Sequence, residues 1–193
     1  VSLGCVDKLP QILSFLPGSY LVKQEFNCYD YDIIITVDAG NNILRIGIPE
    51  DLLAGTVNID HHGEDSADFG RLNIIDPKRA SASEIILDLL EFLDYKITKD
   101  IATCLLTGVF TDTNGFQNTN TTHRVLETAS KLMLKGANLN KIAFNTFQNK
   151  SIATLKIWGR ALARVQKNPK TGMVTSVITK NDLTALKAHF GEE

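Results

Sequence analysis

The sequence has few cysteines and histidines and no long apolar run. Of its 193 residues, three are cysteine and four are histidine. Cys5, Cys28 and Cys104 are odd in number and form no CxxC pair, so we expect free thiols rather than a disulfide framework. No stretch approaches the roughly 18 uninterrupted apolar residues of a membrane span, and the start of the chain lacks the basic-then-apolar layout of a signal peptide. We therefore expect a cytoplasmic protein with no membrane partner.

The sequence also has little net charge. A formal charge of −2 provides no broad basic surface for long duplex nucleic acid, although a local metal-rich pocket could hold a short phosphate ester. With 44% hydrophobic residues the chain can bury one substantial core. It shows no internal repeat and no low-complexity tract.

Apolar runs alternate with helical patterns along the chain. We expect strands at residues 32–37, 56–59 and 71–75, the first of them buried on both faces. Helices are expected at residues 81–94, from 98 or 99 through 106, at 121–135, from 138 or 140 through 147, and at 151–165, followed by a strand at 173–179 and a short helix from 181 or 182. This alternation predicts an α/β fold with a mostly parallel sheet and helices on both faces.

Local signals at helix ends support these assignments. Ser81 and Glu84 have the spacing of a capping box, in which each side chain bonds the other residue's backbone. Gly136 is expected to stop the helix before it in a left-handed conformation.

The pattern changes after Lys150. We expect a main domain at residues 1–148, a linker helix at 149–166 and the incomplete start of a second α/β domain at 167–193. The chain begins with Val1 rather than Met, so an incomplete or processed N-terminus is also expected.

Acidic and histidine side chains follow three apolar runs. Asp38, the triplet Asp60-His61-His62 and Asp112 each stand at an expected strand exit or in the loop after it. Because the carboxyl ends of parallel strands meet at one edge of a sheet, these groups are expected to share one crevice. Such oxygen and nitrogen ligands suit manganese, zinc or iron, and two ions about 3.5–4 Å apart could hydrolyse a phosphate ester, with Asp38 as the bridge. Alternatively, the aspartates are turn or cap residues and the histidines are merely solvated.

Three segments resemble motifs of a known superfamily. "VDAG", "NIDHHG" and "GVFTDTNGF", in this order, resemble the second, third and fourth motifs of the DHH phosphoesterases. "ASASEIILDLLEFL" and "NTNTTHRVLETASKLMLKGANL" are similar to the subgroup with nanoRNases, 3′-phosphoadenosine 5′-phosphate phosphatases and cyclic-dinucleotide phosphodiesterases. The resemblance extends from about Leu9 to Asp182.

The resemblance implies a role for each site residue. Asp38 would bridge two manganese ions, for which Mg²⁺ or Co²⁺ could substitute, and His61 and Asp112 would both ligate the same one of them. His62 would face the substrate phosphate as a charge stabiliser or proton donor. Asp60 would receive an imidazole N–H and so fix which ring nitrogen meets the metal.

The chain departs from the family pattern in two places. Nothing before Asp38 matches the first motif, His-x-x-x-Asp-x-Asp, and the chain ends at Glu193 before the glycine-rich, histidine-bearing loop of the DHH-associated domain. Because only part of the family's ligand set is present, we expect this chain to bind metal weakly and to be weakly active or inactive alone. The missing first strand is also expected to leave an exposed sheet edge or uncovered apolar surface.

The function implied is metal-dependent hydrolysis of short oligoribonucleotides or small nucleotide phosphates. One alternative is a truncated, non-catalytic nucleotide-binding or assembly module, and another is a pyrophosphatase or polyphosphatase on the same scaffold. Arg45 could contact a phosphate, although a lone surface arginine is more often an ion-pair partner. Phe116 could stack on a base or pack in the core. The resemblance also allows a homodimer.

Overall fold

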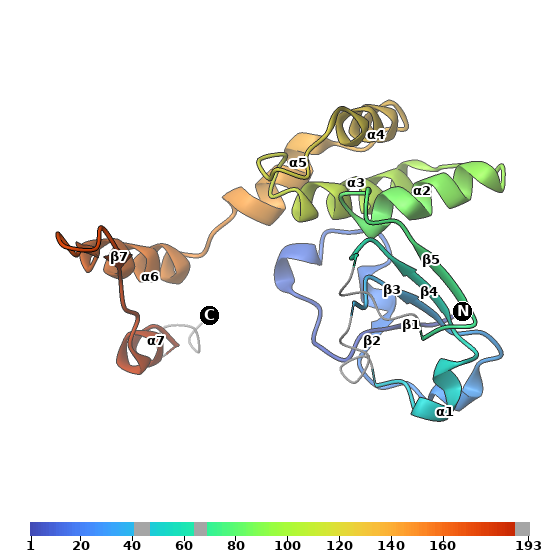
Figure 1. Cartoon of the computed structure of the whole chain (residues 1–193), viewed down its shortest axis with the longest axis horizontal. Helices are drawn as coiled ribbons and strands as arrows, with labels where there is room; N and C mark the ends of the chain where they lie inside the picture. The colour runs from blue at the N-terminus through green and yellow to red at the C-terminus, as the bar shows by residue number, and fades with distance from the viewer. Residues whose placement is uncertain (41–46, 64–68, 188–193) are drawn as a thin grey trace. The chain divides into compact units, whose positions relative to one another are not determined.

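The computed structural model describes residues 1–40, 47–63 and 69–187 (Figure 1). It divides into two compact units, residues 1–146 and 147–193. This division falls near the boundary that we expected after residue 148. The expected linker at 149–166 and the start of a further domain at 167 stay predictions.

A parallel three-stranded sheet forms the centre of the first unit. Strands β3 (Ile35–Val37), β4 (Val57–Asp60) and β5 (Leu72–Ile75) lie in the order β3-β4-β5, with all neighbours parallel. A separate parallel pair joins β1 (Leu3–Gly4) to β2 (Val22–Lys23). The expected α/β class with a parallel sheet is therefore confirmed, and the carboxyl ends of β3, β4 and β5 meet at one edge of the sheet.

Strand β3 is not buried on both faces, so that expectation was wrong. Ile35 is 59% exposed and Val37 47% exposed, and only Thr36 between them is buried. The Thr36 hydroxyl donates to the side chain of Asn58 on β4 at 2.9 Å. Among the described strands β3 pairs only with β4 and so lies at the edge of this sheet. The exposed Ile35 and Val37 side chains place apolar surface on this strand.

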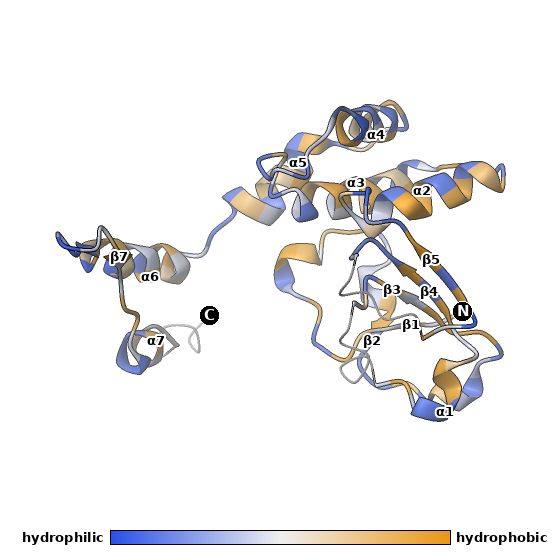
Figure 2. Cartoon of the chain, in the orientation of Figure 1, coloured by the Kyte–Doolittle hydropathy of each residue, from blue (hydrophilic) through white to orange (hydrophobic). Residues whose placement is uncertain are grey.

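Four helices build the main apolar core of the first unit. They are α2 (Ala82–Phe92), α3 (Lys99–Asp112), α4 (His123–Leu134) and α5 (Leu139–Ala143). Their buried side chains form one cluster, with Leu87 from α2; Ala102, Leu105, Leu106 and Phe110 from α3; Ala129 and Leu132 from α4; and Ala137 and Ile142 in or before α5. Figure 2 shows apolar and polar residues alternating along α2 at helical spacing. Helix α2 also contacts β4 and so places the helical layer against the sheet.

Shorter elements complete the first unit. Helix α1 (Glu50–Leu53) precedes β4, and 3₁₀ turns occur at Gln11–Leu13, Ser19–Leu21 and Cys28–Asp30. After α5 the chain continues in a π-helical turn, Phe144–Gln148.

The helix ends follow the signals in the sequence with one difference. Gly136 has a φ of 101°, and its amide donates to the carbonyl of Met133, so the expected left-handed stop is confirmed. At the start of α2 the Glu84 carboxylate accepts from the Ala80 amide at 2.7 Å, but the Ser81 side chain makes no capping bond. Glu84 therefore bonds the amide one residue before Ser81, and the reciprocal Ser81–Glu84 capping box does not form.

Helix α3 continues unbroken to Asp112, whereas the sequence suggested that it gives way before Gly108 and that Asp112 follows a strand. That placement of Asp112 was wrong. A Cβ atom on Gly108 would lie only 2.1 Å from the Ser83 Oγ, so glycine here allows α3 to pack closely on α2. The β-branched residues fit the helix because Thr107 and Thr111 donate their hydroxyls to carbonyls one turn back, at 2.8 Å and 3.0 Å.

The second unit contains α6 (Ile152–Ala163), the antiparallel pair β6 (Gln166–Lys167) and β7 (Val174–Thr175), and α7 (Lys180–Lys187). The strand expected at residues 173–179 is therefore only two residues long. Asp182 joins α6 to α7 by accepting from Arg160 at 3.2 Å and from Arg164. The Arg164 guanidinium and the Thr179 hydrogen bonds hold the pKa of the Asp182 carboxyl well below its usual range.

Transmembrane helices can be assessed only for the part of the chain that the structure describes. There, none of the helices has both the length and the apolar character that crossing a bilayer requires.

Candidate metal centre

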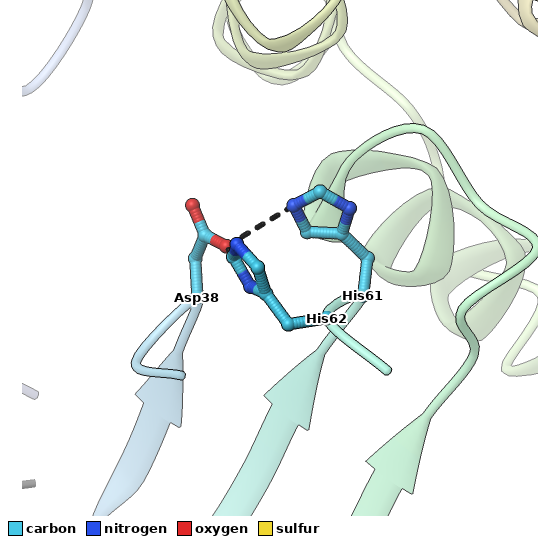
Figure 3. A group of neighbouring side chains, drawn as sticks. All are labelled: Asp38, His61 and His62. Carbon is cyan, nitrogen blue, oxygen red and sulfur yellow. Dashed lines mark ion pairs between the residues drawn. The ribbon is translucent and has the colours of Figure 1, made fainter. Parts of the chain in front are cut away.

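The predicted site residues meet beyond the carboxyl ends of β3 and β4 (Figure 3). The Asp38 Oδ1 lies 3.3 Å from the His61 Nε2 and 3.5 Å from the His62 Nδ1. The Asp112 Oδ2, at the end of α3, lies 3.9 Å from the same His61 Nε2. Three segments that are distant in the sequence thus bring two carboxylates and two imidazoles to one place.

A left-handed turn directs the Asp38 side chain into the site. Asp38 has a φ of 58°, and Gly40 has a φ of 53°. Positive φ is uncommon for a residue with a Cβ atom and is tolerated best by asparagine and aspartate. The Asp38 amide still donates to the Ile59 carbonyl at 2.9 Å, so the turn begins directly from the sheet.

His61 is oriented by a backbone carbonyl. Its Nδ1 lies 3.4 Å from the Arg79 carbonyl oxygen, which makes Nδ1–H the donor and leaves Nε2 facing Asp38 and Asp112. The hydrogen bond that the protonated ring donates to Asp38 raises the pKa of His61, burial opposes this shift, and the negative charges of Asp38 and Asp112 add to it. The nitrogen that faces the two carboxylates is therefore the one available to a cation.

Asp60 holds His62 rather than His61. Its Oδ1 accepts from the His62 Nδ1 at 2.7 Å and from the His62 amide at 3.0 Å, and its Oδ2 accepts from the Gly40 amide at 2.6 Å. The Asp60 side chain is completely buried, whereas that of His62 is 46% exposed. Burial opposes the charge on Asp60, but the bonds from His62 and Gly40 outweigh it, so the pKa of Asp60 is lowered.

Asp112 carries the strongest electrostatic perturbation in the site. Burial and the nearby charge of Asp38 raise the pKa of Asp112 to about 6, although His61 and His62 oppose the shift. Its backbone carbonyl accepts from the side chains of Asn118 and Asn120 at 3.3 Å and 3.4 Å. A bound cation would offset the unfavourable free energy of two neighbouring carboxylates.

Two pairs of donor atoms are close enough together to share a divalent cation. One ligand atom each from Asp38, His61 and His62 lie within 4.8 Å of one another. Two atoms bonded to one ion at about 2.1 Å can be at most about 4.2 Å apart. The 3.3 Å between Asp38 and His61 and the 3.9 Å between His61 and Asp112 both meet this limit. Carboxylate oxygen and imidazole nitrogen are ligands that suit several divalent ions, and the identity of the ion stays a prediction.

The other candidate residues are less informative. Arg45 lies outside the described residues, so its contact with phosphate stays a prediction. Phe116 packs edge to face on Phe110 with ring centroids 5.3 Å apart and lines an apolar groove with Leu126 and Met133 of α4. This packing favours the core alternative for Phe116 over base stacking.

Sequence reasoning missed two groups that orient the site, the Arg79 carbonyl and the Gly40 amide. Both act through the backbone, so side-chain identity gave no signal for them. The Arg79 guanidinium itself points to other partners, with Nε 3.4 Å from Asp76 and NH2 bonded to Asp88.

Comparison with known proteins identifies the family. Residues 3–109 match the model of the DHH family, N-terminal domain. Over 132 residues the chain is 32% identical to a bifunctional oligoribonuclease and PAP phosphatase NrnA from Thermus thermophilus, covering 68% of this chain and 40% of the relative. A protein of the same name from Mycoplasma genitalium is 26% identical over 155 residues, covering 79% of this chain and 48% of the relative.

A solved structure shows the same fold. The crystal structure of an exopolyphosphatase-related protein from Bacteroides fragilis matches 97% of this chain and 58% of its own, with a TM-score of 0.84 and 25% identity. The family model covers more than half of the chain, and the chain belongs to the DHH family. It spans about half the length of the curated relatives that it matches.

Proposed function

We propose that the chain is the metal-binding catalytic part of a phosphoesterase that hydrolyses short oligoribonucleotides or small nucleotide phosphates. The observation that carries this proposal is the placement of the Asp38 carboxylate within 3.3–3.5 Å of both His61 and His62, with the Asp112 carboxylate 3.9 Å from the same His61 nitrogen that faces Asp38. The names of the NrnA relatives support the substrate class. The free thiols of the chain suit a reducing cytoplasm.

In this proposal the metal residues keep the roles that the resemblance implies. Asp38 would bridge two Mn²⁺ ions, and His61 and Asp112 would both hold the same one of them. When bound, such ions supply a hydroxide nucleophile and balance charge on the phosphoryl group. The ligands are few, so we expect weak binding and slow hydrolysis by this chain alone.

His62 is the group that we assign to the substrate. Its Nδ1 is held by Asp60 at 2.7 Å, so Nε2 is the ring nitrogen left for the phosphate. When both nitrogens carry protons, Nδ1–H remains bonded to Asp60 and Nε2–H can be donated to the leaving oxygen.

Manganese titration tests the proposal directly. Calorimetry in the absence of substrate should show Mn²⁺ binding that Asp38→Asn weakens about 100-fold or more, because a ligand is lost. Asp94→Asn is the matched control, since Asp94 is also an aspartate in the left-handed region, with a φ of 50°, but lies at the end of α2. Equal Mn²⁺ affinity in the wild type and in Asp38→Asn would refute the proposed metal centre.

Hydrolysis assays then separate the substrate classes. A 5′-phosphorylated diadenylate, 3′-phosphoadenosine 5′-phosphate and inorganic tripolyphosphate are offered with Mn²⁺, and release of mononucleotide or phosphate is measured. We expect turnover of the two nucleotides, much faster in a longer form that carries His-x-x-x-Asp-x-Asp. Turnover of tripolyphosphate alone would favour the polyphosphatase alternative, for which the exopolyphosphatase-related structure is the supporting observation. Mn²⁺ binding without any turnover in either form would favour the non-catalytic module.

A further inference from the structure

The Asp38 turn is attached to β4 at two points. At its start the Asp38 amide donates to the Ile59 carbonyl at 2.9 Å, which continues the sheet by one bond. Two residues later the Gly40 amide donates to the Asp60 Oδ2 at 2.6 Å. Asp38 therefore lies between two anchors supplied by consecutive residues of one strand.

The second anchor differs from a sheet bond because a side chain provides it. Asp38 and Gly40 both have positive φ, so after the first anchor the backbone turns away from the direction of β3 and regular pairing with β4 ends. At this point the completely buried Asp60 carboxylate, rather than a backbone carbonyl of β4, is the hydrogen-bond acceptor. Hydrogen bonds to a charged acceptor are shorter and stronger than neutral ones, and the 2.6 Å distance fits such a bond.

One carboxylate thus contacts both sides of the metal centre. The Asp60 Oδ2 bonds the Asp38 turn, while its Oδ1 bonds the amide and the ring of His62. We propose that Asp60 is a positioning residue for the Asp38 carboxylate, acting through the Gly40 amide, in addition to orienting His62. The link to catalysis rests on the proposed function, whereas the positioning of Asp38 concerns the metal-free protein.

The bond itself can be observed in the wild-type protein. We expect a scalar coupling across the hydrogen bond between the Gly40 amide nitrogen and the Asp60 carboxyl carbon, and slow exchange of the Gly40 amide proton. In Asp60→Asn the exchange of this proton should accelerate at least tenfold, and in His62→Ala it should stay slow. Absence of the coupling, or unchanged exchange in Asp60→Asn, overturns the proposal.

A double-mutant cycle tests whether the bond positions Asp38. If Asp60 acts only through His62, adding Asp60→Asn to His62→Ala leaves Mn²⁺ affinity unchanged. We expect a further loss of about tenfold, which is typical for partners that orient metal ligands. An unchanged affinity in the double variant overturns the proposal.

Thr36→Val is the control for a merely structural effect. Thr36 bonds Asn58 at 2.9 Å and so also joins β3 to β4 through a buried polar contact, but it lies before the turn. Its removal should lower the melting temperature and leave Mn²⁺ affinity unchanged. If the wild type binds no Mn²⁺, the proposed function fails, and the Gly40 amide measurements still decide whether Asp60 holds the turn.

Discussion

Replacing Asp112 with asparagine should stabilise the metal-free protein above neutral pH. Burial and Asp38 raise the pKa of Asp112 from 3.8 to about 6, so the native protein binds this proton more tightly than the unfolded chain does. The stability that this proton provides is present below pH 3.8. It is lost as the pH rises through 6, above which the native state carries the full cost of the charge.

The size of the effect follows from the shift. Each pKa unit corresponds to about 1.4 kcal/mol, so the raised pKa corresponds to about 3 kcal/mol at most. The Asp112 side chain is 31% exposed, and solvent screening reduces the expected gain to about 1–2 kcal/mol. For a protein of this size the melting temperature of Asp112→Asn should rise by about 3–6 °C at pH 8.

Thermal unfolding followed by circular dichroism in EDTA measures this difference at pH 8 and pH 5. The gain should shrink at pH 5, where native Asp112 is largely protonated. Asp100→Asn is the control, because Asp100 is an exposed carboxylate in the first turn of the same helix, where its charge is favourable. The reasoning is refuted if Asp112→Asn is no more stable than wild type at pH 8, or if its gain is the same at both pH values.

Other predictions concern the same site and the packing of α3. His61→Ala should abolish Mn²⁺ binding in calorimetry, whereas His123→Ala, which changes an exposed histidine at the start of α4, should leave it intact. Wild-type affinity for Mn²⁺ should increase as the pH rises through 6. The pKa values of His61 and Asp112 are both raised, and both groups must lose protons to bind the ion. An affinity that does not change with pH would contradict this prediction. Gly108→Ala should lower the free energy of unfolding by about 1 kcal/mol, because a Cβ atom there meets a side chain of α2. Gly159→Ala should raise the free energy of unfolding by up to about 1 kcal/mol, because nothing lies within 4 Å of a Cβ atom at that position. Urea denaturation distinguishes the two glycines, and equal changes would show that packing against α2 does not decide the outcome.

Local patterns predicted most of the elements because they act over a few neighbouring residues. The apolar runs before Asp38 and Asp60 correctly predicted strands β3 and β4, and Gly136 correctly predicted the end of α4. The run ending at Asp112 was misread as a strand because it is rich in β-branched residues, whereas in the structure Thr107 and Thr111 bond carbonyls one turn back within α3. The predicted burial of β3 was wrong because a local pattern does not state which elements cover the two faces of a strand.

The sequence by itself determined the chemistry of the centre: which carboxylates and imidazoles are available, and that each follows an apolar run. Only the tertiary structure decided that Asp112 arrives from a helix, that the Arg79 carbonyl orients His61, and that Asp60 bonds both His62 and Gly40. The physical reason is that these contacts depend on distances between separate segments and on backbone groups that every residue carries. Side-chain identity specifies the donors and acceptors, whereas packing selects the partners that they meet.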